Sequence, residues 1–71
     1  MTLACTRRGK YRIGSFKKMN EFTEKLSKVG FIEGCEIEVT DIDSKSMIVS
    51  LKNSDFILCK EIAGLIEVEK I

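Results

Sequence analysis

The chain has 71 residues, a net charge of +1 and 44% apolar residues. This length is about half that of a typical domain, so it holds one domain and excludes a separate catalytic domain. The apolar fraction is enough for one small core and excludes a disordered chain. Ordering a chain of this size costs on the order of 100 kcal/mol, and the free energy gained by burying apolar surface barely exceeds that cost. We therefore expect no large internal substrate site.

Positive charge is concentrated at the start of the chain. Residues 1–18 carry six of the twelve basic residues and none of the eleven acidic residues. A basic end attracts nucleic acid, anionic lipid or an acidic protein surface. The alternative, which we favour, is a solvated strand whose charges pair with acidic residues elsewhere, because six charges alone are a weak signal for nucleic acid.

Three widely spaced cysteines, Cys5, Cys35 and Cys59, differ from the dense, even set of a small secreted disulfide scaffold. Each lies beside apolar residues, so we expect buried free thiols in a reducing compartment. No apolar run has the length of a secretory signal or a membrane span. We therefore expect a cytoplasmic protein without direct membrane insertion.

The first predicted strand covers residues 10–16, after Gly9. Its alternation places Tyr11 and Ile13 on one face. Gly14 lies inside this stretch and predicts a bulge or a sharp bend.

One short helix is predicted over residues 21–29. Asn20 is a suitable N-cap, and Gly30 follows the last periodic residue and ends the helix in a left-handed conformation. The apolar residues at spacings of four and three share one helical face: Phe22, Leu26 and Val29. A helix of this length needs packing to be stable.

Four more short strands complete the predicted fold, over residues 36–40, 47–51, 56–59 and 66–69. Turns are predicted over residues 41–45 and 52–55, and one helical turn over residues 60–64. Short antiparallel strands with tight connections favour a barrel. The expected fold is mostly β: one domain over residues 1–71, a small SH3-like β-barrel of about five strands with one short α-helix between the first and second strands. An exposed edge such as Phe56–Cys59 could pair between chains, so we expect a monomer or a weak homo-oligomer.

The residues of common reactive sites are missing. Without histidine there is no imidazole base, histidine ligand or Ser/His pair. The carboxylate pairs have the i, i+2 spacing of exposed strand faces, and Asp41-Ile42-Asp43 lacks the remaining ligands of a calcium loop. We expect no catalytic residue, no metal site and no cofactor, and hence no enzyme.

A docking surface needs apolar side chains that the core cannot absorb. Phe31 and Ile32 lie in the turn between two glycines, where we expect both to be incompletely buried, and Ile48 has the outward parity of its strand. The predicted partner-binding patch consists of Lys17, Lys18, Met19, Phe31, Ile32 and Ile48. The alternative is that one or two of its apolar residues cap the open end of the barrel beneath the helix.

Two segments resemble the FeoA family, small cytoplasmic proteins encoded with ferrous-iron transporters. The first segment is Lys25–Val39. It contains the end of a helix with a basic residue followed by Leu, then apolar–Gly–apolar, two further residues, a second Gly and an alternating strand. The second segment, residues 58–68, resembles the end of the family's sequence, which has a closing strand, an acidic turn that contains Ala, and the motif Ile-x-Val. In addition, Gly9 matches the glycine that opens the family's first strand. Glu33 stands where the family often has Pro, and residues 42–46 form a shorter connection without Gly or Pro.

This resemblance implies an SH3-like barrel that acts as an accessory factor of a FeoB-type membrane iron transporter, by association and without chemistry. Basic residues 7–18 would then steer the approach to an acidic or lipid-proximal face. A similar domain ends the iron-dependent repressors of the diphtheria-toxin type, so a stand-alone regulatory module of that kind is the main alternative. A small-barrel nucleic-acid binder and a metal-sensing module are further alternatives, and transition-metal binding follows from the family name only.

Overall fold

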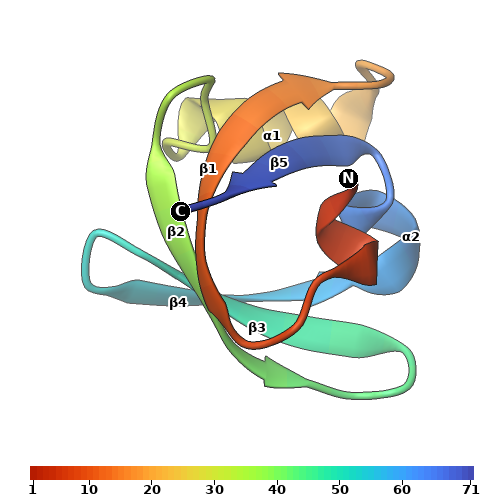
Figure 1. Cartoon of the computed structure of the whole chain (residues 1–71). Helices are drawn as coiled ribbons and strands as arrows, with labels where there is room; N and C mark the ends of the chain where they lie inside the picture. Colours follow the sequence, from red (N-terminus) through yellow and green to blue (C-terminus); the bar gives the residue numbers. More distant parts are fainter.

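A computed structural model describes residues 1–71. Its elements in chain order are η1 (Leu3–Cys5), β1 (Gly9–Phe16), α1 (Glu21–Lys28), β2 (Glu36–Ile42), β3 (Ser46–Leu51), β4 (Ser54–Cys59), α2 (Lys60–Ala63) and β5 (Ile66–Lys70). The five strands form one antiparallel, curled sheet of order β4-β3-β2-β1-β5 (Figure 1). Because β4 and β5 are not paired with each other, the barrel stays open between these two edges.

The core is built from alternate residues of the strands, as the period-two pattern predicts. Tyr11 and Ile13 of β1 are buried, and the same alternation recurs on β2 and β3. Leu3 of η1 and Ala63 of α2 are fully buried as well, where these two short helices pack together at one end of the barrel (Figure 1). The predicted class, a small SH3-like barrel with one short helix between its first two strands, is confirmed.

Two irregularities in strand pairing test the predicted bend and the predicted strand boundaries. The bend predicted at Gly14 is confirmed, because the register of β1 against β5 shifts between Ile13 and Phe16. The turn predicted over residues 41–45 starts too early, because β2 continues through Ile42, which pairs with Met47 of β3. A second register shift after Val39 allows this extension.

The start of α1 is fixed by a capping box, which confirms the predicted N-cap. The Asn20 Oδ1 atom accepts hydrogen bonds from the N–H groups of Phe22 (2.9 Å) and Thr23 (3.0 Å). The Thr23 Oγ1 atom accepts one from the Asn20 N–H at 2.7 Å, and Thr23 is fully buried. These bonds satisfy backbone donors that have no partner within the helix.

Replacing Asn20 with alanine is expected to lower the free energy of unfolding by about 1 kcal/mol, because both N–H groups lose their acceptor. Asn20→Asp keeps an acceptor and adds a favourable charge at the helix N-terminus, so it is expected to retain the wild-type stability. Urea unfolding followed by circular dichroism measures both variants. Equal losses in the two would show that the side chain acts through something other than the cap.

The end of α1 closes in a Schellman motif. The Gly30 N–H donates to the Ser27 carbonyl at 3.3 Å, and the Phe31 N–H donates to the Leu26 carbonyl at 3.0 Å. Gly30 has a φ of 119°, which allows the chain to turn back under the helix. As a result α1 is fixed mainly at its ends, and its apolar face is only partly covered.

Candidate protein-docking groove

The structure corrects the expectation that Phe31 is exposed. Its side chain is fully buried, and its ring packs edge-on against that of Phe56 with 5.2 Å between the centroids. The turn from Gly30 to Gly34 directs Phe31 inward and leaves Ile32 about half exposed at 51%. Phe31 therefore caps the barrel beneath the helix, as the alternative interpretation predicts for one or two residues of the patch.

The other apolar members of the predicted patch lie on separate elements. Met19 precedes α1 and is 54% exposed, whereas Ile32 follows the helix. Ile48 has the predicted outward parity on β3, where it is half-buried and pairs with Ile57 of β4. None of these residues lines the groove described next.

The two lysines of the predicted patch have different surroundings. Lys17 lies 3.7 Å from the carboxylate of Glu67 on β5, measured from Nζ to Oε2. Lys18 is exposed, and its backbone carbonyl accepts a hydrogen bond from the Thr23 hydroxyl at 3.1 Å. Both side chains precede α1 and belong to the surface beside Met19.

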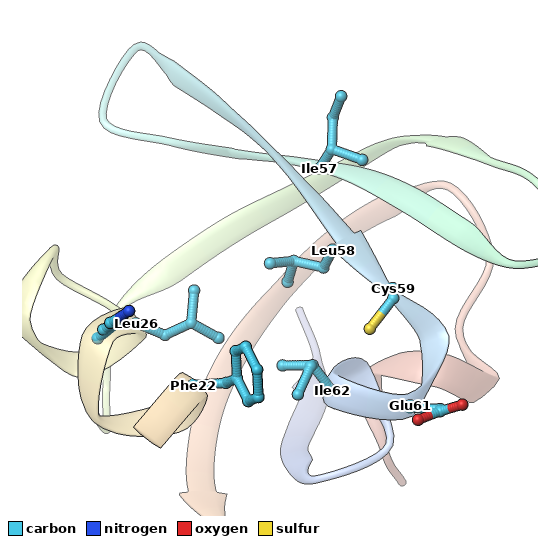
Figure 2. A pocket seen from close by; sticks show the side chains of 8 residues that line it. Phe22, Leu26, Ile57, Leu58, Cys59, Glu61 and Ile62 are labelled. Carbon is cyan, nitrogen blue, oxygen red and sulfur yellow. The ribbon is translucent and has the colours of Figure 1, made fainter. Parts of the chain in front are cut away.

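An apolar groove of about 510 Å³ lies between α1, β4 and α2. It is lined by Phe22, Lys25, Leu26, Ile57, Leu58, Cys59, Glu61 and Ile62. Figure 2 shows the side chains of Phe22, Leu26, Leu58 and Ile62 pointing toward one another. The side chain of Ile57 points to the other side of β4, so this residue contributes its backbone to the groove.

Each wall of the groove follows from a local feature of the sequence. The capping box sets the start of α1, which places Phe22 in its first turn and Leu26 one turn later on the same face. On β4, alternation turns Leu58 inward, and α2 follows that strand directly and supplies Ile62. The walls are therefore held by capping, strand parity and a tight connection.

Phe22 is the most notable wall residue, because 58% of its surface is exposed. The charged residues beside it are balanced: Lys25 lies 3.9 Å from Glu21 of the same helix, and Glu61 is exposed on the opposite wall. An apolar surface with a sparse polar border is typical of sites that bind other proteins. This arrangement can bind an apolar segment.

The basic first strand has acidic neighbours, which supports the interpretation as a charge-paired strand. Arg12 lies 3.9 Å from Glu36 of β2, and Lys10 pairs in register with Glu38 of the same strand. Before the strand, Arg8 forms an ion pair with Asp41 at 3.1 Å. Arg8 and Arg12 are therefore paired with carboxylates, which weakens the attraction of this segment for phosphate groups.

The cysteines and carboxylates are dispersed over the structure. No group of three or more Cys, Asp and Glu side chains converges where it could hold a metal ion. Cys5 and Cys59 are exposed and Cys35 is half-buried, all as free thiols, so the expectation that all three fill the core is wrong. No helix of the chain has the length and apolar character needed to cross a membrane.

The fold and the groove define a small, open SH3-like β-barrel with an apolar groove between α1, β4 and α2. The family model for the FeoA domain matches residues 1–70, and the chain therefore belongs to the FeoA family. This confirms the resemblance carried by residues 25–39 and 58–68. No curated protein matches the chain.

Several solved structures share the fold. Iron(II) transport protein A from Clostridium thermocellum is 32% identical with a TM-score of 0.89, and the chain covers 46% of that protein while being covered completely. An iron uptake regulatory protein, FeoA, is 23% identical with a TM-score of 0.89; 100% of this chain and 97% of that one are covered. ScaR with bound Cd²⁺ is 23% identical with a TM-score of 0.86, covering 99% of this chain and 35% of that one. At identities of 23%, the last two likenesses show the fold alone.

Proposed function

We propose that this chain is a cytoplasmic, non-enzymatic accessory protein of ferrous iron uptake that binds a FeoB-type membrane transporter through the apolar groove. The observation that carries the proposal is the groove itself, with Phe22 58% exposed beside Leu58 and Ile62. Membership of the FeoA family and the 32% identity to an iron(II) transport protein supply the transport context.

The mechanism is association. A protein that binds one conformation of its partner more tightly than another shifts the partner's population toward the first. The chain needs no bound iron for this role, which agrees with its dispersed cysteines and carboxylates. The pairing of Arg12 with Glu36 argues against the nucleic-acid alternative, and the likeness to ScaR at 23% identity is a likeness of fold alone.

The test compares capture of the transporter by matched variants. The tagged chain is incubated with detergent-solubilised membranes of the source cell, and bound proteins are identified by mass spectrometry. We expect enrichment of a FeoB-type transporter, reduced about tenfold or more by Phe22→Ser, because a few large side chains buried at the centre of an interface carry most of its binding energy. Ile32→Ser removes an apolar side chain of similar exposure outside the groove and is expected to retain capture.

Melting temperatures of both variants check that folding is unchanged. Loss of capture with Ile32→Ser but not with Phe22→Ser would move the docking site to the patch predicted from the sequence. Enrichment of a repressor or of nucleic acid in place of the transporter would overturn the proposed partner.

A further inference from the structure

The backbone of β4 has hydrogen-bonding groups that no element of the fold uses. The β3–β4 hairpin turns through Lys52 and Asn53, both at positive φ (50° and 70°), and closes on the pair Leu51 and Ser54. In such two-residue hairpins the closing pair is hydrogen-bonded, and bonded and non-bonded pairs alternate from there. Asp55 and Ile57 fall at non-bonded pairs, so their N–H and C=O groups point away from β3.

These groups have no other backbone partner. β4 ends the sheet, and no backbone hydrogen bond outside the regular elements reaches Asp55 or Ile57. Sheets normally protect such an edge with a bulge, proline, several charges or a cover. β4 pairs with β3 in unbroken register over six residues, has no proline and carries one charge, at Asp55. The edge is therefore free to pair with another strand.

The apolar groove lies on the inner side of this same edge. Leu58 points inward to Phe22 and Ile62, whereas the Ile57 side chain points outward and is 76% exposed (Figure 2). An added strand alternates its side chains in the same way. One set of its side chains would then enter the groove between Phe22 and Ile62, and the other set would lie beside Ile57 and its cross-strand neighbour Ile48.

We propose that β4 binds an extended, uncharged, apolar segment of its partner protein as a sixth strand of the sheet. The backbone of Asp55 and Ile57 supplies the hydrogen bonds, and the apolar groove selects the side chains. This mode of binding, strand addition to a sheet edge, gives affinity through the main chain and specificity through alternate side chains. The inference rests on the proposed function, because it describes how the groove holds the transporter.

The size and the charge of the groove indicate which kind of partner it binds. A stable interface between globular surfaces takes about 20–30 residues and about 800 Å² from each partner, which is about a sixth of this chain's 4609 Å². The groove has eight lining residues, which suits one segment and is too small for a stable dimer with a second copy. The groove has one cation, Lys25, and one anion, Glu61, so its charge is balanced and matches an uncharged segment.

The test replaces Ile57 in two ways and repeats the transporter capture. Ile57→Pro removes the outward N–H and places a ring where the added strand would pair, but it breaks no hydrogen bond of this chain. Ile57→Thr keeps the N–H and the strand propensity. We expect Ile57→Pro to reduce capture about tenfold or more and Ile57→Thr to stay within about threefold of wild type, with melting temperatures measured for both.

Amide hydrogen exchange in the wild-type chain gives a readout that does not depend on folding of the proline variant. Binding of the captured transporter is expected to slow exchange at Ile57 and Asp55 specifically. Unchanged exchange at these two amides in the complex would overturn strand addition, whatever the variants do.

The outcomes separate this inference from the proposed function. Capture that is lost with Phe22→Ser and retained with a folded Ile57→Pro would overturn strand addition and leave the groove as the docking site. Capture unaffected by Phe22→Ser would overturn both. A dimer of the free chain in sedimentation, abolished by Ile57→Pro, would assign the edge to a second copy and overturn the proposed occupant.

Discussion

Replacing Phe31 with alanine is expected to lower the free energy of unfolding by about 3–5 kcal/mol. The ring is fully buried, and its edge-on contact with Phe56 joins the turn after α1 to strand β4. Truncation leaves a cavity that the surrounding strands cannot fill without disturbing their pairing. A chain of this length has a total stability of about 4–10 kcal/mol, so the variant would be close to unfolded at room temperature.

Phe22→Ala is the matched control, since it removes the same ring from a position that is 58% exposed. We expect this variant to lose less than about 1 kcal/mol. Thermal and urea unfolding followed by circular dichroism measure both. A loss below about 1 kcal/mol for Phe31→Ala would contradict its place in the core and would return Phe31 to the docking surface expected from the sequence.

The structural features that the sequence predicts correctly are those whose cause lies within a few residues along the chain. Alternation along β1 predicts that Tyr11 and Ile13 are buried, because successive side chains of a strand point to opposite faces. Asn20 is recognisable as an N-cap because its amide oxygen reaches the backbone two and three residues later. Gly14 indicates the bulge because a glycine inside a strand marks a bulge or a close backbone approach, and a Cβ there would lie 3.3 Å from the Glu67 carbonyl oxygen.

Local patterns did not determine which of two neighbouring apolar residues enters the core. Phe31 and Ile32 share one short turn, yet the first is fully buried and the second is 51% exposed. The difference depends on the position of Phe56, which is distant in the sequence and reaches Phe31 only through the pairing of β3 with β4. A turn residue is therefore poorly assigned until the strands around it are placed.

The apolar groove was missed for a related reason, because its walls come from elements that are far apart in the sequence. The sequence indicates that Phe56–Cys59 is an exposed edge, but it does not place this edge beside Phe22 and Ile62. In this sheet the segment forms the edge strand β4, so one parity, represented by Ile57, faces outward. The exposed face of Phe22 and Val29 likewise shows that α1 has more apolar surface than the barrel end covers.

Replacing either glycine that brackets the turn after α1 is expected to have the second large effect on the free energy of unfolding. Comparing the two variants separates the cost of backbone strain from the cost of packing. Both glycines have positive φ, 119° at Gly30 and 91° at Gly34, which side chains with a Cβ rarely adopt. A Cβ at Gly34 would meet no atom within 4 Å, so Gly34→Ala is expected to lose about 1–3 kcal/mol from backbone strain alone.

Gly30→Ala adds a steric cost to the same strain. The new Cβ would lie 3.1 Å from the Cδ2 atom of Leu51, which is 3% exposed and has little room to move. We expect a total loss of about 2–5 kcal/mol, measured by urea unfolding beside Gly34→Ala. Equal losses would mean that Leu51 moves aside at no cost and that the turn is fixed by backbone conformation. A larger loss at Gly30 would show that the end of α1 is packed directly on Leu51 of β3.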